Sequence, residues 1–93
     1  MAKVTAKTIL EDAIRLKEQK SKDYQGHVWT EEDYFPFDDY SYIHMLWTKM
    51  LRIRSLAENP DTPNFESLQD SVIDLINYAS MYGAYLENKG EDL

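Results

Sequence analysis

The chain has 93 residues, no cysteine and a formal net charge of −7. This length allows one domain, the missing thiols exclude disulfides and thiolate metal sites, and the acidic balance argues against a protein that coats DNA or RNA. No signal peptide and no apolar run of roughly 18 residues is present, so we expect a cytoplasmic protein with no membrane partner. A small, aromatic-rich domain has more apolar surface than it can bury alone, which predicts a homo-oligomer.

The first predicted helix covers residues 8–22. Thr8 and Glu11 have the spacing of a capping box, in which each side chain accepts a hydrogen bond from a backbone N–H of the first turn. Lys17, Lys20 and Lys22 suit the negative end of the helix dipole. The predicted apolar stripe of this helix consists of Ile9, Leu10, Ala13, Ile14 and Leu16.

A long ordered loop is predicted over residues 23–38, because Gly26 and Pro36 interrupt the helical periodicity. The loop is rich in aromatic side chains, which disordered segments lack, so we expect it to pack against the helices. Such packing fits either a cover over the bundle or one wall of a ligand site. The aromatic residues of the loop are Tyr24, Trp29, Tyr34, Phe35 and Phe37.

A second helix is predicted over residues 39–58. It begins at a capping residue between Asp38 and Ser41 and ends before a turn that contains two prolines. Lys49 and Arg52 lie one turn apart on a side separate from the apolar stripe. The predicted buried stripe comprises Ile43, Leu46, Trp47, Met50, Ile53 and Ala57.

A third helix is predicted over residues 65–87, with Asn64 as its cap and a frayed polar end after it. The chain as a whole therefore predicts an all-α fold. We expect one domain over residues 1–93, a small three-helix antiparallel bundle with a long aromatic loop between the first two helices. The apolar stripe predicted for the third helix consists of Leu68, Val72, Leu75, Ala79, Tyr82 and Leu86.

Three carboxylates, those of Glu66, Asp70 and Asp74, recur every fourth residue on the opposite side of the third helix. Stacked carboxylates repel one another by a few tenths of a kcal/mol per pair, so a counter-charge or water must accompany them. Mg²⁺ takes oxygen ligands from several elements, but the second helix offers Lys49 and Arg52 instead. We therefore expect salt bridges between these two helices, with a metal site and a solvent-exposed acidic face as alternatives.

Four stretches of the chain carry a family resemblance. They are Lys22-Asp23-Tyr24, Tyr34-Phe35-Pro36-Phe37, Lys49 with Arg52-Ile53-Arg54-Ser55-Leu56, and Asn64, Glu66 and Asp70 with Asp74-Leu75-Ile76-Asn77-Tyr78-Ala79. Together they resemble the phage-borne nucleotide modification associated domain family over residues 16–86. That family is in turn similar to the MazG-like all-α nucleotide pyrophosphatases. The resemblance implies a MazG-like helical bundle, completed by oligomerisation, that works on nucleotides in an infected bacterial cell.

The chain departs from the MazG-like pattern at the metal ligands. The resemblance implies a Glu-x-x-Glu pair on one helix and a Glu-x-x-Asp pair on the next. Ser67 stands where the second pair needs its glutamate, with Glu66 one residue out of place, and the first pair is replaced by Lys49 and Arg52. Pyrophosphate cleavage in such enzymes needs the metal to neutralise developing charge. We therefore expect no catalytic residues and no cofactor.

The leading hypothesis is a non-catalytic, nucleotide-binding phage protein that sequesters a nucleotide signal, such as a cyclic nucleotide, of host anti-phage defence. A second hypothesis is a Mg²⁺-dependent pyrophosphatase. Its metal would be held by Glu66, Asp70 and Asp74, completed by Asp38, Asp39 or Glu32 from the loop or from a second subunit. A third is a helical adaptor that binds another protein through its aromatic surface.

The candidate ligand-binding residues fall into three groups by chemistry. Cations contact phosphate directly, aromatic rings stack on a base or sugar, and polar side chains position the ligand or pair with the cations. The cations are Lys49 and Arg52, followed by Lys20, Lys22 and Arg54. The rings are Tyr24, Trp29 and Tyr78, and the polar group is Asp70, Asp74 and Asn77.

Overall fold

The computed structural model of the chain describes residues 3–23, 30–59, 61 and 67–91, with the side chains of 21–23 and 90–91 left aside. Within these ranges it contains helices and no strand, which confirms the all-α prediction. The helices are α1 (Ala6–Asp23), α2 (Glu31–Tyr34), α3 (Asp39–Glu58) and α4 (Leu68–Glu91). Each of these described helices is too short or too polar to cross a lipid bilayer.

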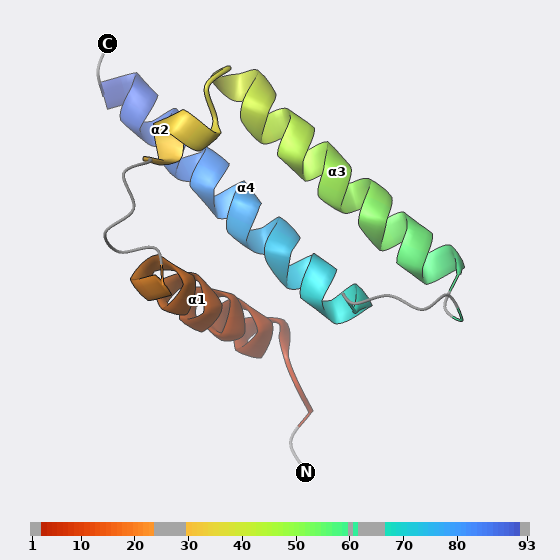
Figure 1. The fold of residues 1–93 in the computed structure, drawn as a ribbon. Coiled ribbons are helices and arrows are strands. Elements are labelled where there is room, and N and C mark those ends of the chain that lie inside the picture. Colours follow the sequence, from red (N-terminus) through yellow and green to blue (C-terminus); the bar gives the residue numbers. More distant parts are fainter. Residues whose placement is uncertain (1–2, 24–29, 60, 62–66, 92–93) are drawn as a thin grey trace.

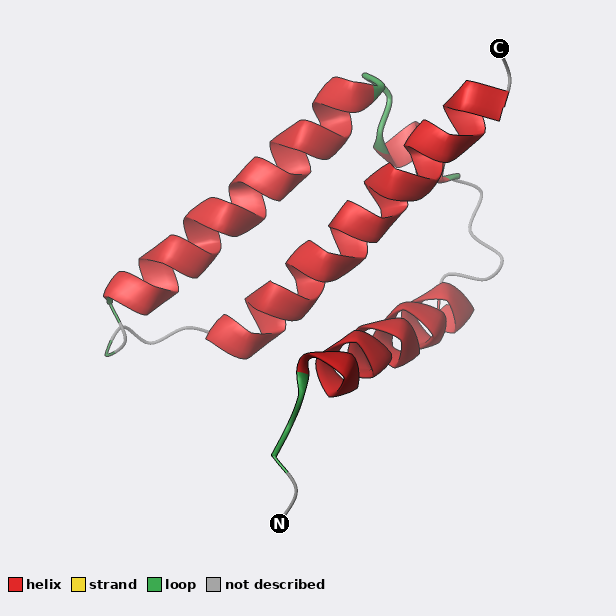
Figure 2. Ribbon diagram, turned by 180° about the vertical axis from the view of Figure 1, so that it is seen from behind, coloured by secondary structure: helices red, strands yellow, loops and turns green. Residues whose placement is uncertain are grey.

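Helix α4 occupies the middle of the arrangement. Its backbone lies close to those of α1 and α3, whereas no Cα atom of α1 lies within 8 Å of one in α3 among the described residues. Figures 1 and 2 show α3 running beside α4 in the opposite direction, with α1 on the other side of α4. The predicted three-helix bundle is therefore open, because only one of its helices touches both of the others.

The open arrangement leaves a thin core. The radius of gyration is 15.2 Å, against about 12 Å for a compact domain of this length. Among the described residues, only Ala13, Phe35, Tyr42 and Ser71 are buried, and of these only Ser71 is fully so. Most apolar side chains of the long helices are therefore only half-covered.

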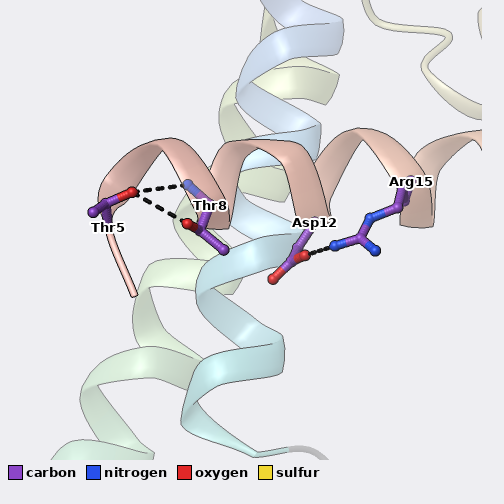
Figure 3. A network of polar contacts seen from close by, with 4 residues as sticks. All are labelled: Thr5, Thr8, Asp12 and Arg15. Carbon is purple, nitrogen blue, oxygen red and sulfur yellow. Dashed lines mark hydrogen bonds and ion pairs between the residues drawn. The ribbon is translucent and has the colours of Figure 1, made fainter. Parts of the chain in front are cut away.

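Helix α1 begins two residues earlier than predicted because Thr5, rather than Thr8, is its cap. The Thr8 backbone N–H donates to Thr5 Oγ1 at 3.3 Å, and the two threonine hydroxyls lie 3.2 Å apart (Figure 3). The predicted capping box of Thr8 and Glu11 is wrong. Further along the same helix, Asp12 and Arg15 form an ion pair (Figure 3).

The predicted loop contains a short helix, α2, that the sequence reading missed. Its capping box joins Thr30 and Asp33: the Thr30 backbone N–H donates to Asp33 Oδ2 at 2.8 Å, and the Asp33 N–H donates to Thr30 Oγ1 at 3.3 Å. The Thr-Glu-Glu-Asp spacing is the signal that predicts this turn of helix.

Five aromatic rings from three segments of the chain form what we call the aromatic stack. Phe35 lies 4.4 Å from Tyr42 with the ring planes 2° apart. Tyr42 also lies 5.3 Å from Tyr82 and 5.0 Å from Tyr85, and Tyr78 meets Phe35 edge-on at 6.3 Å. The stack confirms that the aromatic loop packs at Phe35. Tyr34 and Phe37 are exposed, and Tyr24 and Trp29 lie outside the described residues.

Helix α3 has the predicted bounds, but its buried side differs from the prediction. The stack places Tyr42 inward, and this rotation exposes Ile43, Trp47, Met50 and Ala57, which were expected to be buried. The residues that face inward, buried or half-buried, include Tyr42, Met45, Leu46, Lys49, Ile53 and Leu56.

The start of α3 is also unusual. Asp38, the residue before the helix, has a φ of 52° and its side chain makes no capping hydrogen bond. The Phe37 backbone N–H instead donates to Ser41 Oγ at 2.8 Å.

Helix α4 differs from its prediction at both ends. It begins at Leu68, where Ser67 Oγ accepts from the Asp70 backbone N–H at 3.0 Å; the predicted cap, Asn64, lies outside the described residues. The predicted frayed end is instead helical to Glu91, and Lys89 lies 3.8 Å from Asp39 at the start of α3. Of the predicted stripe, Leu68, Ala79 and Leu86 are exposed and Val72, Leu75 and Tyr82 are half-buried.

We predict that enlarging Ala13 destabilises the fold. Ala13 is 2% exposed on α1, so Ala13→Leu forces extra carbons into a filled contact and should cost about 1–3 kcal/mol in the free energy of unfolding, measured with urea. The matched control is Ala57→Leu, because Ala57 is exposed and its enlargement should stay within about 0.5 kcal/mol of wild type. Equal losses in both variants would contradict the assigned packing.

Candidate functional site

Three helices bring charged side chains together at Asp74. Lys49 Nζ of α3 lies 3.1 Å from Asp74 Oδ2, and Lys20 Nζ of α1 lies 3.5 Å from Asp74 Oδ1. The Lys49 and Asp74 side chains are 11% and 18% exposed, whereas Lys20 is 52% exposed. The predicted salt bridge between the second and third long helices is confirmed, and α1 supplies a further cation.

An aromatic ring completes the site, which we call the Asp74 cluster: Lys20, Lys49, Asp74 and Tyr78. Lys49 Nζ lies 5.8 Å from the centre of the Tyr78 ring, within the range of a cation–π contact. Tyr78 follows Asp74 by one helical turn, so both side chains project toward the same side of α4. The cluster therefore joins the aromatic stack through the edge-on contact of Tyr78 with Phe35.

The other predicted cations are placed differently. Arg52 is exposed, one turn beyond Lys49 on α3. Arg54 pairs with Glu58 at 2.9 Å on its own helix and lies about 140° around that helix from Lys49, away from the cluster. The side chain of Lys22 lies outside the described residues.

Of the remaining polar candidates, Asp70 and Asn77 lie within one helical turn of Asp74 on α4. Asp70 is exposed one turn before Asp74, and Asn77 is half-buried on an adjacent side of α4. Glu66, the first carboxylate of the predicted row, lies outside the described residues, as do Tyr24 and Trp29.

A metal site within one subunit finds little support in the described residues. No three of their His, Asp and Glu side chains are grouped for a metal ion. Asp39, a proposed completing ligand, contacts Lys89. Lys89 and Asp74 are separated along α4 by about 22 Å, at 1.5 Å per residue. Asp39 of the same subunit therefore cannot complete a site at Asp74, and neither can its neighbour Asp38.

Two buried residues, one beside the Asp74 cluster and one in the aromatic stack, were not predicted from the sequence. Ser71 is fully buried one turn before the cluster; a small residue between two acids on one helix face was the available signal. Tyr42 donates its hydroxyl to Glu31 Oε2 at 2.7 Å. Burial, together with the hydrogen bond to the Glu31 carboxylate, raises the pKa of Tyr42 far above its ordinary value.

Removing the Asp74 charge should destabilise the protein. Asp74→Asn leaves Lys49 with a weakened partner in a partly buried setting, and we expect a loss of about 1–3 kcal/mol in the free energy of unfolding by urea. Asp70→Asn is the matched control on the same helix, because Asp70 is exposed, and its effect should stay within about 0.5 kcal/mol. An unchanged stability in Asp74→Asn would show that the cluster does not hold the helices together.

Alkaline pH should destabilise the protein through Tyr42. Its pKa in the folded state is raised above the ordinary 10.0, so above pH 10 the unfolded chain releases this proton first and stability falls as pH rises. Tyr42→Phe should reduce that decline by up to about 1.4 kcal/mol per pH unit, measured by urea unfolding between pH 9 and 11.5. The same slope in Tyr42→Phe and wild type would contradict the prediction. Tyr34→Phe, on an exposed ring, controls for loss of a hydroxyl.

Comparison with known proteins returns no relative for this chain. No family model matches it, and neither the search of curated proteins nor the search of solved structures finds a match. The family resemblance of the sequence therefore stays a prediction, and a function for this chain has to be argued from the geometry of the Asp74 cluster.

Proposed function

We propose that the chain binds a nucleotide at the Asp74 cluster without cleaving it. The observation that carries the proposal is the convergence of two lysines, from different helices, on one carboxylate beside a tyrosine ring. Ammonium groups neutralise phosphate directly, and an aromatic ring supplies a surface for a base or sugar. Binding by cations needs no metal and no chemical step.

Lys20 is the group that a phosphate reaches first. Its contact with Asp74 spans 3.5 Å and its side chain is half-exposed, so the ion pair contributes only about 0–1 kcal/mol. A phosphate oxygen forms a stronger, charge-assisted hydrogen bond and can draw Lys20 away from Asp74. Lys49 stays with Asp74 underneath, where it neutralises the carboxylate that would otherwise repel the phosphate and keeps its contact with the Tyr78 ring.

The proposal extends to the biological setting that the sequence resemblance implies. A MazG-like scaffold assembled as a homo-oligomer would place such clusters at fixed positions in one particle. A phage protein of this kind would sequester a nucleotide signal, such as a cyclic nucleotide, and so protect the phage from host defence. Sequestration requires tight binding without turnover, which is the chemistry that lysines in place of acidic metal ligands provide.

The test is calorimetry of the purified protein against mono-, di- and cyclic nucleotides, with inorganic phosphate as the minimal probe. We expect at least one nucleotide to bind, and no binding at ~100 μM across the panel would overturn the proposal. Lys20→Ala should weaken binding on the order of 10-fold, since it removes one charge-assisted contact. Lys17→Ala, which removes an exposed lysine of the same helix, should leave affinity unchanged.

A parallel assay separates binding from catalysis. Each nucleotide is incubated with the protein and Mg²⁺, and released pyrophosphate and phosphate are measured. The proposal expects none above background. Release that depends on Mg²⁺ and disappears in Asp70→Asn would establish the pyrophosphatase alternative instead.

A further inference from the structure

Helix α3 has a second apolar side that nothing in the described chain covers. Its exposed large side chains are Tyr40, Ile43, Trp47, Met50 and Leu51, and we call this surface the outer face. Trp47 lies near its centre and is 63% exposed. In Figures 1 and 2, α3 forms one edge of the molecule, with α4 on its other side.

The outer face has the dimensions of a helix-packing surface. At 100° per residue its side chains spread over about 100° of the helix, and from Tyr40 to Leu51 it extends for about 17 Å. A stripe about 100° wide is what a helix buries against a neighbour. The inward residues, such as Met45 and Lys49, lie on the opposite side, so α3 has apolar residues on two sides.

The accessible surface is larger than that of a compact monomer. It measures 7766 Å², whereas a compact monomer of 11.0 kDa exposes about 5,600 Å². The surplus of roughly 2,000 Å² exceeds the roughly 800 Å² that each partner buries in a standard interface. Part of this surplus lies on the outer face, whose large side chains are 47% to 79% exposed.

We propose that the outer face binds the outer face of a second copy, with the two α3 helices antiparallel about a two-fold axis near Trp47. In this pairing Trp47 packs near its own counterpart, and Tyr40 of one subunit lies opposite Arg54 of the other. The charge of Arg54 is already paired with Glu58 at the rim, 2.9 Å away. The centre therefore carries no uncompensated charge, as the core of an obligate interface requires.

A hollow at one end of the outer face suits this arrangement. It has a volume of about 550 Å³ and is lined mainly by aromatic and apolar side chains, among them Phe35, Phe37, Tyr40 and Met45. The antiparallel pairing brings the other subunit's α3, near Leu51 and Arg54, to this hollow. Tyr40 belongs both to the outer face and to the lining of the hollow, so a two-fold interface near Trp47 would use the hollow twice.

Sedimentation equilibrium tests the inference without reference to any nucleotide. The wild-type chain should be a dimer or a higher oligomer containing it, and Trp47→Glu should raise the dissociation constant at this interface on the order of 100-fold. Ile14→Glu is the matched control, because Ile14 is 56% exposed on α1, and it should associate as wild type does. Circular dichroism confirms that each variant is helical.

Crosslinking tests the register and covers the case in which Trp47→Glu fails to fold. The chain has no cysteine, so single-cysteine variants are clean probes for a short bis-maleimide. A mixture of Tyr40→Cys and Arg54→Cys should give the mixed crosslinked pair, whereas Tyr40→Cys alone should not, since its two copies lie about 21 Å apart.

Three results would overturn the inference. They are a wild-type monomer at all concentrations, dissociation by Ile14→Glu but not by Trp47→Glu, and crosslinking of Tyr40→Cys to itself. A monomer that still binds a nucleotide would leave the proposed function standing, and a dimer that binds none would leave the interface standing.

Discussion

The simultaneous packing of α4 against α1 and α3 is the constraint on which the structure depends. Among the described helices the backbones of α1 and α3 stay apart, so the packing of each on α4 sets where they lie relative to one another. The three helices are joined at Asp74, whose carboxylate forms an ion pair with one lysine from each neighbouring helix. Ser71, fully buried one turn earlier, is small enough to let a neighbouring helix approach closely.

In this arrangement Asp74 holds helices together, and that role competes with the binding of a catalytic metal ion. A carboxylate that ties two helices through lysines has its oxygens engaged, and a divalent ion would have to displace both ammonium groups. Under the proposed function, a bound phosphate draws Lys20 away and so alters one of the contacts that hold α1. Ligand binding and the position of α1 are then coupled through a single side chain, because Lys49 and Asp74 stay together beneath it.

Helix α3 explains why so small a chain has so large a surface. Its inward side supplies Tyr42 to the aromatic stack and Lys49 to the Asp74 cluster, so it cannot turn its other apolar residues inward as well. A helix that is apolar on two sides is stable in water only when both are covered. The thin core and the outer face are therefore two consequences of one sequence feature, and the proposed pairing with a second copy would cover the outer face.

The sequence alone determined the helical class, the bounds of α3 and the ion pair between α3 and α4, because these depend on local periodicity and on the signs of charge. The tertiary structure decided which side of each helix is buried. Trp47 and Tyr42 are equally good core residues by composition, and only the stacking of Tyr42 against Phe35, from the segment before α3, and against Tyr82 of α4 selects between them. Lys20 joined Asp74 for a similar reason: no spacing in the sequence relates α1 to α4, and only packing brings their charges within reach.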